Sequence, residues 1–348
     1  MSTACSTRPR RSGAHRKSAR CAGVEPGPPP VAGEFDLIDR IAARTVARDD
    51  VVLGIGDDAA LLQPPAGRQL VVAMDTLNSG VHFPADTAPA DIGWKALAVN
   101  LSDLAAMGAT PAWCTLSLSL PDPDAAWIDA FLDGFDALAQ RHGVALVGGD
   151  TTRGPLSICV TVFGLVAPGS ALRRDGAQPG DDIWLSGTPG DAAAALAQWS
   201  RGAVRDPALR SRLDRPTPRV ALGLALANLA HAAIDVSDGL LADLGHVCRA
   251  SNVAAHIDVD ALPVSDALGA LGLDADSRRA LQAGGGDDYE LCFTASPTAR
   301  DAVASAAATA ATPVARIGRI VEGAGVTAVR SDGVAWAPSR AGWDHFAG

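Results

Sequence analysis

Aspartates beside glycines and at the ends of apolar runs are the side chains of this chain best suited to chemistry. They are Asp57, Asp58, Asp75, Asp150, Asp235, Asp238, Asp287 and Asp288. Loops at strand ends are where α/β folds build their sites, and neighbouring glycines let a ligand approach the backbone closely. Carboxylates that gather without matching lysines favour a hard divalent cation such as Mg²⁺, which takes oxygen ligands and bridges to phosphates. Such a cation also removes the repulsion between adjacent carboxylates.

Each of these side chains also has a structural explanation when taken alone. Aspartate next to glycine is a common turn residue, and Asp238 stands where it could cap the following helix. His82 is more often a packed histidine than a ligand, and Trp343 more often anchors a chain end. Six aspartates at strand ends favour a shared site, although spacing alone does not show that they meet. Neither lysine, Lys17 or Lys95, follows a glycine-rich loop, which excludes the Gly-Lys-Ser/Thr phosphate loop.

The elements that must position these residues alternate between strands and helices. Helical spacing of apolar residues predicts helices at 34–46, 94–108 and 124–143, the last ending at Gly143. Strand-like runs occupy 51–62, 69–77, 111–121, 144–154, 155–166, 182–190 and 232–235, and the run at 144–154 is expected to enter a glycine turn before Asp150. Residues 168–182 are rich in proline, glycine and charge. We therefore predict an α/β or α+β fold with domains at 34–168 and 169–348.

Charge is divided unevenly along the 348 residues. Residues 1–33 carry six basic residues against Glu25 and lack the apolar core of a secretory signal, so they are predicted to form a disordered basic leader. The net charge of −10 for the whole chain leaves −15 on the rest, which argues against nucleic-acid binding. No apolar run approaches the roughly 20 residues of a membrane span. We expect a soluble protein that binds neither nucleic acid nor membrane.

The cysteines follow no pattern typical of a metal or redox site. Cys114, Cys159 and Cys292 lie in apolar, strand-like runs, and no pair of cysteines in the chain has CxxC spacing. Small buried thiols are common in such runs. We predict that they are structural thiols of a protein in the reducing cytoplasm.

Seven short segments give the chain a family resemblance. In order they read GIGDDAALL, DTLNSGVHF, KALAVNLSDLAAMGA, GGDTTRG, IDVSDGL, GDDYELCF and GWDHF. From about Glu34 to the C-terminus the chain resembles the thiamine-monophosphate kinases, members of the aminoimidazole-ribonucleotide-synthetase-like superfamily. NLSDLAAMGA together with GGDTTRG is highly specific, whereas SDG alone is weak. The resemblance implies an N-terminal β/α domain that binds ATP and Mg²⁺ and forms a homodimer, followed by a C-terminal α/β domain.

The resemblance also implies an activity and a set of site residues. Members phosphorylate thiamine monophosphate to thiamine diphosphate, with ATP as co-substrate and several Mg²⁺ ions. The positions that match Mg²⁺ ligands are Asp58, Met74, Asp75, Asp103, Asp150, Asp235 and Asp238, those that match ATP contacts are Gly149, Asp150, Arg174 and Ser237, and those that match contacts of the thiamine phosphate are His82, Asp287 and Trp343. Because the acceptor oxygen is already ionised, metal ions and positioning suffice for direct in-line transfer, without a covalent nucleophile.

Three places depart from the family pattern. Ala73 and Met74 stand where hydroxyl residues usually precede the DTL aspartate, and because a thioether is a poor Mg²⁺ ligand, Met74 can offer only its backbone carbonyl. Asp287 replaces a glutamate and is one methylene shorter, which predicts a looser or water-bridged grip on the substrate. Residues 78–80 read NSG where VEG is common. These departures concern affinity more than the class of reaction.

Other interpretations stay open. A selenophosphate or aminoimidazole-ribonucleotide synthetase shares the Gly/Asp pattern, but the first needs a reactive N-terminal cysteine beside a lysine, and Cys5 and Cys21 have no such setting. A non-catalytic nucleotide-sensing protein would lack some of the aspartate ligands, and none is lacking. A metal phosphohydrolase would account for the DVD at 258–260, but no threonine follows that pair.

Overall fold

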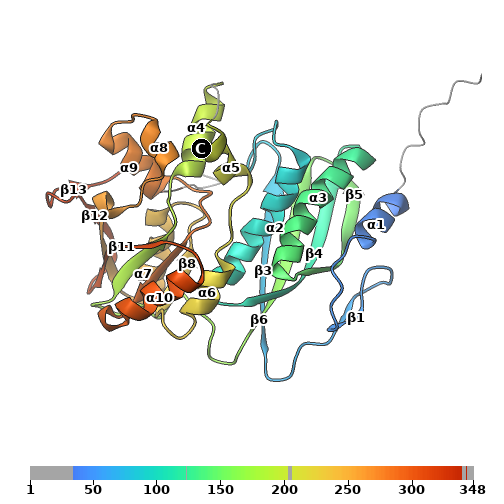
Figure 1. Cartoon of the computed structure of the whole chain (residues 1–348), viewed down its shortest axis with the longest axis horizontal. Coiled ribbons are helices and arrows are strands. Elements are labelled where there is room, and N and C mark those ends of the chain that lie inside the picture. Colours follow the sequence, from blue (N-terminus) through green and yellow to red (C-terminus); the bar gives the residue numbers. More distant parts are fainter. Residues whose placement is uncertain (1–33, 123, 203–205, 339–341, 343–348) are drawn as a thin grey trace, which may run out of the picture. The chain divides into compact units, whose positions relative to one another are not determined.

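Two main sheets and a small hairpin organise the computed structural model, which describes residues 34–122, 124–202, 206–338 and 342 (Figure 1). One sheet has four strands and ends at Val166, and the other has seven strands and begins at Asp182. This mixture of helices and two sheets confirms the predicted α/β (α+β) class. The leader predicted at 1–33 lies outside the described residues. No described helix is both long and apolar enough to cross a membrane.

The first sheet carries Asp75 on an edge strand. Its strand order is β3-β6-β4-β5, formed by β3 (Gln69–Asn78), β6 (Ser157–Val166), β4 (Thr110–Leu120) and β5 (Ala145–Arg153). β4 runs parallel to β5 and antiparallel to β6, and β3 runs antiparallel to β6. β1 (Val51–Leu53) and β2 (Leu61–Leu62) pair as the hairpin expected at 51–62. Beside this sheet lie α1 (Glu34–Ala42), α2 (Pro89–Ala106) and α3 (Ala125–His142) (Figure 1).

Glycines let α2 and α3 pack at very short range. A Cβ atom at Gly93 would lie 2.0 Å from the carbonyl oxygen of Phe131, and one at Gly134 would lie 1.7 Å from the carbonyl oxygen of Ala90. Any larger side chain at either position would push the helices apart. The position of α2, which carries part of the site described below, therefore depends on both glycines.

Element ends differ from the predictions in several places. α1 ends at Ala42, four residues before the predicted end at 46, and β7 (Asp182–Ser186) ends four residues before the predicted end at 190. α2 begins at Pro89, five residues before the predicted start, because proline fits the first turn of a helix. The turn expected before Asp150 is absent, since β5 continues through it to Arg153. Gly149 permits this: a Cβ there would lie 1.8 Å from the carbonyl oxygen of Leu116 on β4. α3 ends at Gly143 in the left-handed conformation, as predicted.

The second sheet supplies the other half of the site. Its order is β13-β12-β9-β11-β7-β10-β8, and β9 with β12 is the one parallel pair among its described strands. The strands are β7 (Asp182–Ser186), β8 (Ala232–Asp235), β9 (Ala254–Asp258), β10 (Leu291–Ala295), β11 (Val314–Val321), β12 (Gly325–Val329) and β13 (Ala335–Trp336). The helices around it are α4 (Asp191–Ser200), α5 (Pro207–Asp214), α6 (Val220–Leu226), α7 (Leu240–Ser251), α8 (Asp266–Ala270), α9 (Ala275–Gly284) and α10 (Arg300–Thr309).

α2 lies between the two sheets. It contacts β3 and β6 of the first sheet as well as β8 and α6 of the second part of the chain. One apolar core runs through this junction, from Leu97 and Leu101 on α2 to Leu291 and Phe293 on β10. Side chains on the polar face of α2 can therefore reach residues from both sheets.

The described cysteines are all free thiols. Cys114 and Cys292 are buried, and Cys159 is half-buried. These three lie on strands of the two sheets, where the sequence predicted structural thiols, and the buried Cys248 lies on α7.

Candidate active site

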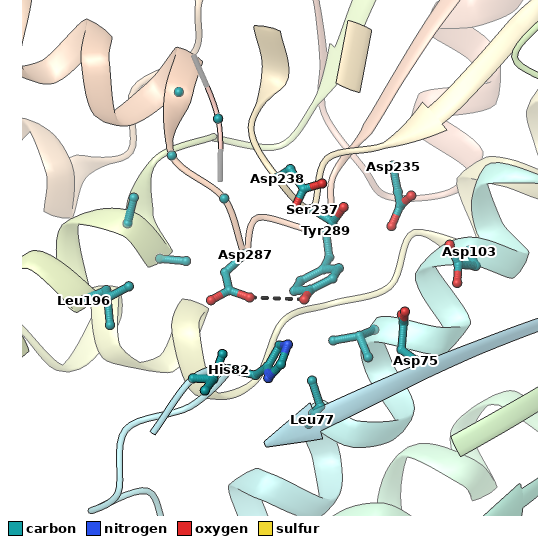
Figure 2. A pocket seen from close by; sticks show the side chains of 18 of the residues that line it. Asp75, Leu77, His82, Asp103, Leu196, Asp235, Ser237, Asp238, Asp287 and Tyr289 are labelled. Carbon is teal, nitrogen blue, oxygen red and sulfur yellow. Dashed lines mark hydrogen bonds between the residues drawn. The ribbon is translucent and has the colours of Figure 1, made fainter. Parts of the chain in front are cut away.

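A cavity of about 770 Å³ opens where β3 and α2 face β8 and the segment before β10. Eight of the predicted site residues line it, namely Asp75, His82, Asp103, Arg174, Asp235, Ser237, Asp238 and Asp287. Figure 2 shows Asp75, Asp103 and Asp235 at one end, and His82 and Asp287 at the other. The cavity therefore has an acidic end and a second, chemically mixed end.

The carboxylates of the acidic end lie close enough to repel one another. Burial raises the pKa of Asp103, and the charges of Asp235 and Asp75 raise it further. Burial likewise raises the pKa of Asp75, with Asp238 adding to the effect. Among the described residues that line the cavity, Arg174 is the one lysine or arginine. Such a group of carboxylates is stabilised when a cation joins it.

Hydrogen bonds from α2 hold the acidic end in place. The Oδ1 atom of Asn100 accepts the backbone N–H of Asp75 at 2.9 Å, and the hydroxyl of Ser102 donates to Asp235 at 2.7 Å. The sequence interpretation missed the roles of both residues. Asn100 stands one helical turn before Asp103, which was the available signal, but its contact with a different strand has no local signature.

Asp243 fixes the turn that carries Ser237 and Asp238. Its Oδ2 atom accepts the backbone N–H groups of Ser237, Asp238 and Gly239, each at 3.1 Å. Burial raises the pKa of Asp243 to about 7, and the charges of Asp235 and Asp238 contribute. This residue was also missed, although an acid in the first turn of a helix that follows Ser-Asp-Gly is a recognisable signal.

Asp287 and Tyr289 form the mixed end together with His82. Both Asp287 and Tyr289 have left-handed backbones, with φ of 65° and 50°. The Tyr289 hydroxyl donates to Oδ1 of Asp287 at 3.1 Å (Figure 2). Burial, followed by the charge of Asp287, raises the pKa of Tyr289 well above its ordinary value, so the phenol keeps the proton that it donates. Tyr289, the single tyrosine of the chain, was not predicted as a site residue.

His82 lies opposite Asp287 in Figure 2, in the turn that follows β3. Its Nδ1 atom accepts the backbone N–H of Asn78 at 3.0 Å, which sets the orientation of the ring. Apolar side chains of Leu77, Val81 and Leu196 line this part of the cavity. The mixed end thus suits a ring with apolar faces and a few polar atoms.

Four predicted site residues do not line the cavity. Asp58 is exposed in the β1–β2 hairpin, and Gly149 and Asp150 are exposed on β5. The Met74 side chain is 61% exposed, and because strand residues alternate between faces it points away from the face that Asp75 occupies. Trp343 lies outside the described residues.

The donor set of the acidic end fits magnesium. Among the described residues no three histidine, cysteine or acidic side chains lie close enough together to hold one metal ion. Mg²⁺ does not require such a cage, since it commonly binds one or two carboxylates and completes its shell with water and substrate phosphates. Four carboxylates around one cavity, with mutual repulsion and little compensating positive charge, have the chemistry that such ions complement.

Comparison with protein families defines the class. Residues 56–166 match the N-terminal domain of the AIR synthase related proteins, and residues 178–331 match their C-terminal domain. The chain is therefore a member of this two-domain family, whose fold the sequence had led us to expect.

Individual relatives show to which enzyme family within this two-domain class the chain belongs. Thiamine-monophosphate kinase of Salmonella typhimurium is 48% identical over 324 residues, which cover 90% of this chain and 98% of that protein. The crystal structure of thiamine-monophosphate kinase from Stenotrophomonas maltophilia K279a is 62% identical with a TM-score of 0.81, covering 87% of this chain and 98% of that one. A structure of AaThiL complexed with AMPPCP and TMP is 32% identical with a TM-score of 0.70, covering 90% and 97%. The chain belongs to the thiamine-monophosphate kinase family of enzymes, and the resemblance seen in its motifs is confirmed.

Proposed function

We propose that this protein transfers the terminal phosphoryl group of ATP to thiamine monophosphate and so forms thiamine diphosphate. The observation that carries the proposal is one cavity with Asp75, Asp103 and Asp235 at one end, His82 and Asp287 at the other, and Asp238 also in its wall. The relative AaThiL, complexed with AMPPCP and TMP, supports a site that takes a nucleoside triphosphate and thiamine monophosphate together. Two polyanions can meet only where their charge is neutralised, and the carboxylates offer ligands for the cations that do this.

We propose Mg²⁺ as the cofactor, in several ions. The residues that would hold it are Asp75, Asp103, Asp235 and Asp238 in the cavity, with Asp58, Asp150 and the backbone carbonyl of Met74 as further predicted ligands. When bound, Mg²⁺ supplies neutralisation of the phosphate charges. Asn100 and Ser102 hold the backbone of Asp75 and the carboxylate of Asp235 in place beforehand, so little reorganisation is needed during the reaction.

Direct in-line transfer requires little acid–base catalysis from the side chains of this protein. The phosphate of thiamine monophosphate is already ionised at neutral pH, so no side chain has to remove a proton from it. We therefore propose that no phosphorylated enzyme forms. Turnover with γ-labelled ATP followed by denaturing electrophoresis should leave no label on the chain, and stoichiometric label on the protein would contradict direct transfer.

The proposed ATP contacts are Arg174, Ser237, Gly149 and Asp150. Arg174 lines the cavity and can pair its guanidinium with a phosphate. The backbone around Ser237 is fixed by Asp243, which supports a role in holding the nucleotide. Gly149 and Asp150 lie on β5 outside the cavity, and their role stays a prediction.

The proposed contacts of the acceptor are His82, Asp287 and Trp343. Asp287 offers a carboxylate oxygen, and the apolar wall formed by Val81 and Leu196 can pack against a heteroaromatic ring. The contribution of Trp343 rests on its motif alone.

A homodimer formed through the first sheet is also proposed. Leu70, Val72 and Met74 alternate along the edge strand β3 and are 50%, 55% and 61% exposed. An apolar row on an edge strand is suited to a second copy of the chain. Sedimentation equilibrium should then give twice the monomer mass. We further propose the domain limits 34–168 and 169–348, and a location in the cytoplasm, which the free thiols support.

Product formation by the full-length chain tests the proposal. ATP and thiamine monophosphate should yield equal amounts of ADP and thiamine diphosphate with Mg²⁺, and neither product after chelation. The substrates of the related selenophosphate and aminoimidazole-ribonucleotide synthetases should remain unchanged. Rapid ATP hydrolysis that does not depend on thiamine monophosphate would favour a phosphohydrolase instead.

A further inference from the structure

Lys95 is the one lysine among the described residues, and the proposed reaction does not use it. It lies on α2, and its side chain is 1% exposed. It is not among the residues that line the cavity. A buried ammonium destabilises a fold unless it is paired, and an apolar side chain of similar volume would often fill the space with less penalty. Packing alone therefore does not account for a lysine here.

The Lys95 ammonium joins two segments that are far apart in the sequence. Its Nζ atom donates to the carbonyl oxygen of His82 at 2.9 Å and lies 3.2 Å from Oδ1 of Asp287. His82 belongs to the turn after β3, whereas Asp287 belongs to the segment before β10. Both side chains line the mixed end of the cavity, where Figure 2 shows them facing one another. The buried Lys95 ammonium thus fixes the position of His82 relative to Asp287 at the mixed end of the cavity, where we propose that the acceptor binds.

The contacts of Asp287 leave one of its oxygens for a ligand. Oδ1 interacts with both Lys95 and the Tyr289 hydroxyl. Figure 2 shows the second carboxylate oxygen directed away from Tyr289, toward the side of Leu196, which also lines the cavity. Two donors on Oδ1 restrict rotation of the carboxyl group more than a single donor would. Asp287 stands where the family usually has glutamate, and its carboxyl group reaches one methylene less far. Its orientation therefore matters for contact with a ligand.

The other carboxylate near Lys95 has a partner of its own. Burial raises the pKa of Asp214, and the charge of Lys95 is among the effects that oppose this. Asp214 forms an ion pair with Arg210, however, and no such pair between Asp214 and Lys95 is described. Asp287 is therefore the carboxylate that pairs with Lys95 in the described part of the chain.

We propose that Lys95 is a positioning residue for the acceptor substrate. By holding Oδ1 of Asp287 and the backbone of His82, it aims the remaining Asp287 oxygen and the imidazole at the acceptor, and it sets affinity for thiamine monophosphate without touching that molecule. This inference rests on the proposed function, because the acceptor end has a defined ligand only if that function is right.

Lys95→Met tests the inference, because methionine keeps much of the volume and removes the charge. The KM for thiamine monophosphate should rise about tenfold, while kcat and the KM for ATP change less than about threefold, as expected when ground-state binding of one substrate is weakened. Tyr289→Phe is the matched control: it removes the uncharged donor from the same oxygen and should raise that KM less, by about twofold. Calorimetric titration with thiamine monophosphate should rank the affinities in the same order, with wild type binding tightest, Tyr289→Phe next and Lys95→Met weakest.

A double-mutant cycle separates positioning from a merely structural role. If Lys95 acts through Asp287, adding Lys95→Met to Asp287→Asn should raise the KM for thiamine monophosphate by less than about twofold over Asp287→Asn alone. Multiplicative effects, an unchanged KM in Lys95→Met, or loss of the folded state in both Lys95→Met and Lys95→Gln would each overturn the inference. A wild-type chain that fails to phosphorylate thiamine monophosphate would instead refute the proposed function, so the two failures are distinguishable.

Discussion

The hydroxyl of Ser102 on α2 donates a 2.7 Å hydrogen bond to Oδ2 of Asp235, the last residue of β8, and both side chains are buried. This bond joins an element that packs on the first sheet to a strand of the second. It also sets the direction of a carboxylate that we propose as a Mg²⁺ ligand. Ser102 therefore links the packing of α2 to the orientation of the Asp235 carboxylate in the cavity.

Ser102→Ala should weaken the response to Mg²⁺ rather than unfold the chain. Removing a hydrogen-bond donor that orients a ligand typically lowers metal affinity or activity by about tenfold or more. The Mg²⁺ concentration for half-maximal rate should therefore rise by about tenfold, with a smaller change in the KM for thiamine monophosphate. A Mg²⁺ titration of the rate measures this. Ser305→Ala, on the exposed surface of α10, is the control and should behave as wild type.

Local patterns predicted the elements and most of the acidic end. Apolar spacing located α3 up to its terminal Gly143, and strand ends in the sequence marked Asp235 correctly as the last residue of β8. The same reasoning failed at Gly149, where a glycine pair was taken for a turn. A Cβ atom at Gly149 would lie 1.8 Å from the carbonyl oxygen of Leu116 on the neighbouring strand. The position therefore requires glycine because of that strand and not because of a turn.

The supporting residues could not be predicted, because their partners are distant in sequence. Asn100 contacts the backbone of Asp75, 25 positions away, and Ser102 contacts Asp235, 133 positions away. Asn100 has one local signal, its spacing of one helical turn from Asp103, and Ser102 has none, and neither signal names the distant partner. Such contacts follow from the tertiary fold, whereas Asp75 and Asp235 are visible at the ends of strand-like runs and Asp238 before a glycine, and Asp103 is visible through the family resemblance.

Asp75→Asn should abolish most of the activity while leaving the fold intact. The change keeps the shape of a half-buried side chain but removes a charge from the acidic end, so the proposed metal ligand set loses one member. We expect kcat/KM to fall by about 100-fold or more. Steady-state kinetics at saturating Mg²⁺ measures the loss, and Asp301→Asn on the exposed part of α10 should have no effect.

Asp150→Asn tests a ligand that the described cavity does not include. Its carboxylate is exposed on β5, yet its motif predicts contact with both metal and ATP. A fall of about 10-fold or more in kcat/KM would support that role. Near-native rates in both Asp75→Asn and Asp150→Asn would contradict the metal assignments as a whole.

Asp260→Asn should make the free energy of unfolding less dependent on pH in the acidic range. The Asp260 carboxylate accepts the backbone N–H of Ser331 at 2.9 Å and pairs with Arg279 at 2.6 Å, and these contacts lower its pKa to about 2. Because the folded-state pKa lies below the ordinary value of 3.8, the stabilisation is fully present above about pH 4 and is lost as the pH falls toward 2.

The variant should therefore be less stable than wild type by about 1 kcal/mol at pH 7, the scale of hydrogen bonds to a charged group that is partly exposed. The difference should shrink as the pH is lowered from 4 to 3. Urea unfolding at a series of pH values measures both quantities. Asp39→Asn, on the exposed side of α1, should show no such trend, and a difference that grows toward low pH would contradict the assignment.

Glu290→Gln should be the most destabilising of these changes, although Glu290 lies outside the cavity. Its carboxylate is fully buried and accepts hydrogen bonds from Arg212 and Arg219, each at 2.6 Å. Burial alone would raise the pKa of Glu290, but the two arginines outweigh it and hold the pKa below its ordinary value. Removing the negative charge leaves Arg219 without its counter-charge and leaves Arg212 only the more distant carboxylate of Asp191, 3.9 Å away, and both arginines are largely buried.

Breaking such a pair on one side typically costs about 3 kcal/mol or more. For a chain of 348 residues we expect the midpoint of thermal unfolding to fall by roughly 4 °C or more, which scanning calorimetry would measure. Arg212→Met combined with Glu290→Gln should recover part of the loss, because one unpaired charge is then removed as well. A double variant no more stable than Glu290→Gln alone would show that the destabilisation comes from lost packing around Glu290 and not from an uncompensated arginine.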